Sequence, residues 1–179
     1  MKTAGLILMT VSGLLYAGQT RGENQFDAYL QVNSQVAYQT TERAQAMTAR
    51  MFREIGVTLH WLSSAPSAGR RPALWLELTD VAPRGLGPSG MAFAMPYEGT
   101  NVKICWCRIE HAPAPDRLLA HVMAHEIGHM LQGTNRHSTS GIMKPVFTVK
   151  DTVQMRSHLF RFDPEDVKLI LEALQKRTR

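Results

Sequence analysis

The pentapeptide His125-Glu126-Ile127-Gly128-His129 constrains the fold of this chain more than any other stretch of its sequence. It lies in residues 116–131, a segment that is rich in helix formers and follows Pro115, so a helix is predicted there. One face of this helix is an apolar stripe of Leu119, Met123, Ile127, Met130 and Leu131. The two histidines point roughly 130–170° away from the centre of that stripe. A fold that holds this helix must therefore bury the stripe and leave a cleft over the histidines.

The spacing of these residues also points to a chemistry. Two histidines four residues apart, with a glutamate directly after the first, form the H-E-x-x-H zinc signature. Neutral imidazoles one turn apart can bind one Zn²⁺ at about 2.0–2.1 Å each. Glu126 lies roughly 60–100° around the helix from them, where it can accept a proton from a water whose pKa zinc lowers to about 7. We expect His125 and His129 to be metal ligands and Glu126 a general base; an ordinary helix with two surface histidines is the alternative.

A catalytic zinc site needs a third protein ligand and one open position. Gly133 can end the helix in a left-handed conformation, after which the chain can return and bring His137 to the metal. A downstream carboxylate such as Glu165 is a rival third ligand. That reading leaves His137 and the run Gly141-Ile142-Met143 without a role.

Residues 125–145 resemble the metzincin clan of zinc metallopeptidases, whose pattern is H-E-x-x-H-x-x-G-x-x-H followed by a Met-turn. The resemblance implies one catalytic zinc ion, held by His125, His129 and His137. It also implies Glu126 as general base and Met143 as the methionine beneath the metal.

The match to the clan departs from its usual spacing. One residue is added on each side of the glycine, so the third-ligand position in strict register is Asn135, a poor zinc ligand. Ser138, after the third histidine, and the Met-x-Pro run at 143–145 are most similar to the matrixin branch. We interpret the difference as a longer connection that still delivers His137.

The remaining sequence predicts a small α+β domain. Helices are predicted at 41–55, at 116–131 and from 163 onward, and strands at 57–62, 73–79, 91–95 and 102–109. The metzincin resemblance implies a twisted, mostly parallel sheet of four to five strands with an antiparallel edge strand. This sheet would pack on the active-site helix, with a further helix at the C-terminus. The domain is expected over 36–179, after an N-terminal extension at 19–35.

An edge strand above the catalytic helix pairs with extended substrates in that clan. The segment that would do so here is Met91, Ala92, Phe93, Ala94 and Met95. This is a prediction from strand order and from the flanking glycines. An ordinary edge strand without a role in binding is the alternative.

The first eighteen residues have the pattern of a secretory signal. Lys2 supplies a charged start, residues 6–15 are apolar but too few to span a membrane, and Ala17-Gly18 gives small residues for cleavage. The sequence therefore predicts a signal peptide at 1–18 and a secreted or periplasmic protein that is not inserted in the membrane after cleavage. An uncleaved anchor is the alternative.

The formal charge of +5 does not indicate a nucleic-acid partner. The excess lies in short clusters such as Arg70-Arg71 and 176–179, whereas nucleic-acid sites carry a basic stripe interleaved with aromatic side chains. We expect a monomer that acts on peptide or protein substrates. The alternative is a catalytically silent binding domain that keeps zinc for structure, although such a site needs no residue like Glu126.

Cys105 and Cys107 are the two cysteines of the chain. In an extended strand their Cα atoms would lie about 6.6 Å apart, at the edge of disulfide geometry. They are expected to stay free, to form a weak bridge, or to bridge between molecules. Zinc binding by two thiolates at this spacing is less favoured.

Overall fold

The computed structural model describes residues 24–66, 73–82, 84–87, 90–94 and 101–177. The described helices are α1 (Tyr38–Arg53), α2 (Pro115–Gln132), α3 (Val149–Gln154) and α4 (Pro164–Arg177), and the strands are β1 (Gln25–Asn33), β2 (Thr58–Trp61), β3 (Leu74–Thr79), β4 (Ala92–Ala94) and β5 (Asn101–Cys105). The strands form one sheet in the order β2-β1-β3-β5-β4, in which β4 alone runs antiparallel to its neighbour. The predicted α+β class and the antiparallel edge strand are confirmed.

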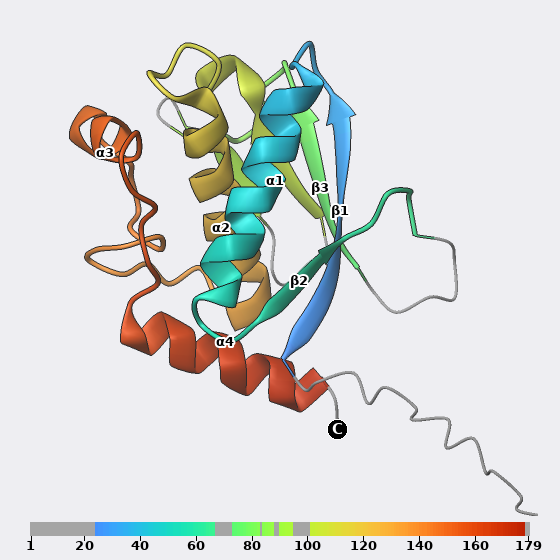
Figure 1. Cartoon of the computed structure of the whole chain (residues 1–179), viewed down its shortest axis with the longest axis vertical. Helices are drawn as coiled ribbons and strands as arrows, with labels where there is room; N and C mark the ends of the chain where they lie inside the picture. Colours follow the sequence, from blue (N-terminus) through green and yellow to red (C-terminus); the bar gives the residue numbers. More distant parts are fainter. Residues whose placement is uncertain (1–23, 67–72, 83, 88–89, 95–100, 178–179) are drawn as a thin grey trace, which may run out of the picture.

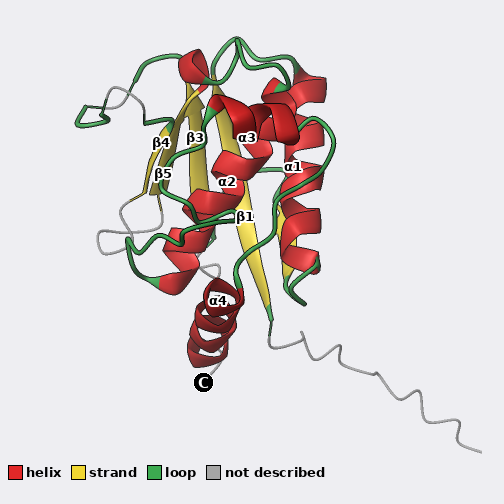
Figure 2. Ribbon diagram, turned by 90° about the vertical axis from the view of Figure 1, so that its left-hand side faces the viewer, coloured by secondary structure: helices red, strands yellow, loops and turns green. Residues whose placement is uncertain are grey.

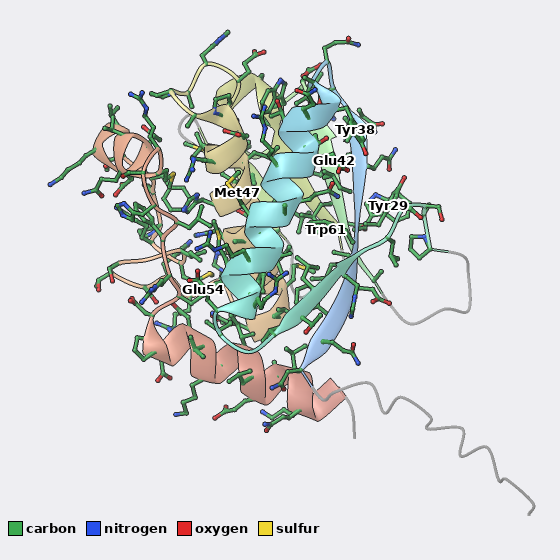
Figure 3. The ribbon with its side chains drawn as sticks, viewed as in Figure 1. Tyr29, Tyr38, Glu42, Met47, Glu54 and Trp61 are labelled. Carbon is green, nitrogen blue, oxygen red and sulfur yellow. A yellow bond between two sulfur atoms is a disulfide. The ribbon has the colours of Figure 1, made fainter. Side chains whose placement is uncertain are left out.

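Helices α1 and α2 lie side by side and cover one face of the sheet (Figures 1 and 2). Alternate residues of β3, Leu74, Leu76 and Leu78, are buried in the core with them, as the two-residue period of a strand requires. At the sheet's outer edge, Trp61 ties β2 to α1, because its indole N–H donates to the Gln45 carbonyl at 3.0 Å (Figure 3). No helix in the described ranges is long and apolar enough to cross a membrane.

Strand β1 corrects the predicted N-terminal extension. Residues 19–35 were expected to precede the domain, yet Gln25–Asn33 lies between β2 and β3 and pairs with both in parallel. Its physical cause is visible in the sequence, where Phe26, Ala28, Leu30 and Val32 alternate with mostly polar residues. The rest of that stretch before residue 24, and the predicted signal peptide, lie outside the described residues.

The strand predicted at 102–109 ends at Cys105 and continues as a 3₁₀ helix, Trp106–Arg108. This turn brings the Cα atoms of Cys105 and Cys107 to 5.3 Å, and the two cysteines form a disulfide. The shortening relative to an extended strand explains why a bond that an extended strand disfavours can form here. Of the outcomes that the sequence left open for these two cysteines, the bond within one molecule is the one that forms.

Candidate metal centre

Helix α2 carries the first part of the site and is embedded in the molecule. Every residue from Leu118 to Leu131 is buried, including His121, His125, Glu126 and His129. The helix ends as predicted, with Gly133 in the left-handed conformation at φ 65°. Because α2 is buried along this length, the side chains that it directs toward the cleft start from a well-fixed backbone.

Three histidines converge beside this helix. The ligand atoms of His125, His129 and His137 all lie within 4.8 Å of one another. The ring centroid of His137 is 5.3 Å from that of His125 and 4.8 Å from that of His129. The longer connection therefore does bring His137 to the other two, whereas Glu165 is exposed on α4 and is not part of this group.

Backbone carbonyls fix the orientation of two of these rings. The Nδ1–H of His125 donates to the Ile142 carbonyl at 2.8 Å, and the Nδ1–H of His129 donates to the Thr134 carbonyl at 2.9 Å. A carbonyl can only accept, so the Nε2 atoms of both neutral rings carry lone pairs. These two Nε2 atoms are 2.9 Å apart. Lone pairs that face each other at this distance repel unless a proton or a cation lies between them.

The surroundings favour a cation over a proton. Burial, together with the nearby His129 ring, lowers the pKa of His125 from 6.5 to about 4. Burial likewise lowers the pKa of His129 and of His137. The rings are thus neutral near pH 7, which is the protonation state that binds metal. Three neutral imidazoles, two of them oriented by backbone carbonyls, fit a borderline-soft ion such as Zn²⁺.

Glu126 lies in the same cleft, with 8% of its surface exposed. Burial raises the pKa of its carboxyl from 4.5 to about 8. A cation held by the three histidines would oppose this shift, since a nearby positive charge stabilises the carboxylate. The site thus pairs a metal-binding group with a carboxyl whose protonation state responds to the metal.

The cleft itself lies between the edge strand and the segment that follows the histidines. Its lining residues are Gly90–Ala94 on one side, Val122, His125, Glu126 and His129 from α2, Asn135 and His137, and Lys144–Phe147 on the other side. Four of the five residues predicted for substrate binding therefore border the histidines. The fifth, Met95, lies outside the described residues.

Met143 is fully buried against α2. A Cβ added at Gly128 would lie 2.5 Å from the Met143 sulfur, so a larger residue at this helix position would require the methionine side chain to shift. The preceding residue, Ile142, receives the His125 hydrogen bond, and its own N–H donates to the Arg161 carbonyl at 3.0 Å. The predicted Met-turn segment thus packs under the helix and helps to orient a candidate ligand.

Two residues of this region were not predicted to matter. His121 is fully buried one turn before His125; its Nδ1–H donates to the Arg117 carbonyl and its Nε2 accepts from the Phe160 N–H. Asp166, also fully buried, contacts the chain on both sides of His137. Spacing gave no signal for Asp166, because an acidic residue in the first turn of a helix is ordinary.

Comparison with known proteins shows a shared fold. No protein-family model and no curated protein matches the chain. A zinc-dependent peptidase from Methanocorpusculum labreanum superposes with a TM-score of 0.59 at 12% identity, over 80% of this chain and 99% of that one. An archaemetzincin from Methanopyrus kandleri superposes with a TM-score of 0.58 at 15% identity, over 87% of this chain and 98% of that one. The chain therefore has a zincin-like fold.

Proposed function

We propose that this protein is an exported, monomeric, zinc-dependent endopeptidase of the metzincin type. The observation that carries the proposal is the convergence of His125, His129 and His137 beside Glu126 in one cleft. The two solved structures of the same fold, one a zinc-dependent peptidase and the other an archaemetzincin, support it. The closer likeness to the matrixin branch, drawn from Ser138 and the Met-x-Pro run, stays a prediction.

In this proposal the three histidines hold one zinc ion, which would supply Lewis acidity toward water and toward the scissile carbonyl. Glu126 accepts the proton of the attacking water and later passes it to the leaving amine. Its burial keeps the carboxyl close to the reacting atoms and limits competing water. The zinc charge would favour the carboxylate needed for the first half of this transfer, while burial favours the neutral carboxyl that carries the proton to the amine.

Strand β4 is proposed to receive the substrate. It pairs with β5 on one side, while the other side borders the cleft. An extended peptide laid against this edge would add a strand to the sheet through backbone hydrogen bonds. That places a peptide bond over the histidines and makes extended peptides or unfolded protein segments the substrate class.

The test compares the zinc-loaded wild type with Glu126→Gln on casein and on quenched-fluorescence peptides. Glutamine keeps the size of the side chain but cannot accept the proton, so kcat is expected to fall by about 10²- to 10⁴-fold. Zinc content measured on both proteins should stay at one ion per chain, because Glu126 is not a ligand. Equal activity of the two proteins would favour the alternative, a zinc-containing binding domain of the same fold.

Export is proposed from the signal-like pattern of residues 1–18. Cleavage after Ala17 or Gly18 would release the catalytic domain into the periplasm or the medium. Intact-mass measurement on protein recovered from outside the cytoplasm checks this. A mass that still includes the first seventeen residues would contradict cleavage and favour the anchor.

A further inference from the structure

The carboxylate of Asp166, at the start of α4, is fully buried. Its Oδ1 accepts from Arg136 Nη2 at 2.7 Å, and its Oδ2 accepts from the Ser138 hydroxyl at 2.7 Å. A weaker contact joins Oδ1 to Gln132 Nε2 at 3.4 Å. All three partners belong to the segment that leads from α2 through His137.

The two close partners stand directly before and after His137 in the chain. A buried carboxylate without partners is costly, so Asp166 strongly favours the one arrangement of this segment that supplies both donors. Arg136 provides the compensating charge at 2.7 Å. Fixing residues 136 and 138 leaves His137 little freedom of backbone position.

His137 needs such support more than the other two histidines do. The rings of His125 and His129 are held by carbonyl acceptors. Among the described residues, none forms a hydrogen bond with the His137 ring, and this histidine is exposed. Its ring is placed by its neighbours in the chain, and those neighbours are held by Asp166.

We propose that Asp166 is the positioning residue for the third ligand, and that it sets the zinc affinity of the site by acting through His137. This inference rests on the proposed zinc site. It adds that the longer connection between the second and third histidines works because a carboxylate on a distant helix fastens both sides of the ligand.

The experiment measures the zinc dissociation constant of the purified, refolded or native full-length protein by competition with a chromophoric chelator. Asp166→Asn keeps the shape but removes the charge that holds Arg136, and it should weaken zinc binding by about 10- to 100-fold, as losses of outer-shell partners do. The matched control is Glu165→Gln, the exposed neighbour on the same helix, which should leave the constant unchanged. A large effect of Glu165→Gln would instead support a carboxylate ligand from α4 and overturn the proposal.

A second arm separates positioning from general stability. If Asp166 acts through His137, Asp166→Asn should change zinc affinity less than twofold when it is introduced into His137→Ala, because the effects of residues that act as a unit do not add. The visible absorption spectrum of the cobalt-substituted Asp166→Asn protein should also shift toward that of His137→Ala. Independent, additive losses in the double variant would overturn the proposal.

Should Asp166→Asn fail to fold, Ser138→Ala and Arg136→Met remove its two close contacts one at a time. Each should weaken zinc binding in the same direction, and unchanged affinity in both would overturn the inference. These outcomes are distinct from a failure of the proposed function. Tight zinc binding by the wild type with unaltered affinity in the variants defeats this inference alone, whereas a wild type that binds no zinc defeats both.

Discussion

Gly141 shows how one residue shapes the turn beneath the site. Its φ is +71°, and an added Cβ would lie 2.3 Å from the Arg161 carbonyl oxygen. That carbonyl also accepts the Ile142 N–H, so moving it away would break a second contact. A side chain at this position is therefore disfavoured both by backbone conformation and by a backbone atom that cannot yield easily.

Gly133 offers a matched control, because it has a similar φ of +65° but nothing within 4 Å of an added Cβ. Gly133→Ala should lower the free energy of unfolding by about 1 kcal/mol, the cost of a left-handed alanine. Gly141→Ala should lower it by clearly more, since the clash adds to the same conformational cost. Urea denaturation of the two variants checks this, and equal losses would show that the Arg161 carbonyl moves freely.

The individual residues of the site differ in how well the sequence predicts them. The relative placement of His125, Glu126 and His129 follows from helix geometry alone, so their spacing was sufficient. His137 lies after a connection whose path no local rule determines. Its position depends on Asp166, which is far away in sequence and lies next to a glutamate that looked more like a ligand.

At the scale of elements, the residues of strand β4 differ in where their backbone N–H and C=O groups point. The Cys105 N–H donates to the Met91 carbonyl at 2.8 Å, and Phe93 lies opposite Lys103 in the register. Because hydrogen-bonded pairs alternate in an antiparallel ladder, Phe93 directs its backbone groups toward β5. Ala92 and Ala94 direct theirs to the free side, which borders the cleft.

This alternation gives a paired prediction for substrate binding. Ala92→Pro removes a donor from the free side at the first residue of the strand, where proline is tolerated. It should raise the KM for extended peptides about tenfold, the loss of one well-made hydrogen bond, with little change in thermal stability. Phe93→Pro should instead lower stability, because it breaks the ladder with β5. Unchanged peptide kinetics in a folded Ala92→Pro protein would leave β4 an ordinary edge strand.

Prediction from the sequence missed elements that were too short to show a period or that adjoined a segment with another pattern. Strand β1 has a clear two-residue alternation, but it follows the signal-like segment and was taken for an extension. Helix α3 has only six residues, too few for a helical period to show. Its capping box, in which the side chains of Thr148 and Asp151 each accept a hydrogen bond from the other's backbone N–H, was visible in the sequence as Thr-x-x-Asp. The strand predicted at 102–109 was too long, because the turn that holds the disulfide has no hydrophobic period to mark where the strand ends.

For the molecule as a whole, His121 links stability to pH. Burial lowers its pKa from 6.5 to about 4. Between these values the unfolded chain binds a proton at this position and the folded protein does not, so the free energy of unfolding falls as the pH falls through this window. Protonation of Nε2 would also abolish its role as acceptor for the Phe160 N–H.

His121→Gln should make the metal-free protein less sensitive to acid. Glutamine can still accept from Phe160 but does not titrate, so the loss of stability from pH 7 to pH 4.5 should be smaller than in the wild type by on the order of 2 kcal/mol. Denaturation with chelator present at both pH values measures the difference. Shifts at His125 and at Glu126, which act in opposite directions, are common to both proteins and cancel. Identical pH profiles would show that His121 already exchanges its proton freely in the fold.

The buried Asp166 contact has a further consequence for how such sites are found and altered. The Asp166 carboxylate holds residues 136 and 138 directly. The connection between His129 and residue 136 can therefore change in length while the ring of His137 stays in place. Insertions beside the exposed Asn135, which keep the Thr134 carbonyl against His129, should therefore be absorbed as surface loop, and the chain can be lengthened there. A sequence pattern with a fixed number of residues between the histidines would miss this chain. A structural criterion would find it: a buried carboxylate, distant in sequence, that contacts the residues on both sides of the third histidine.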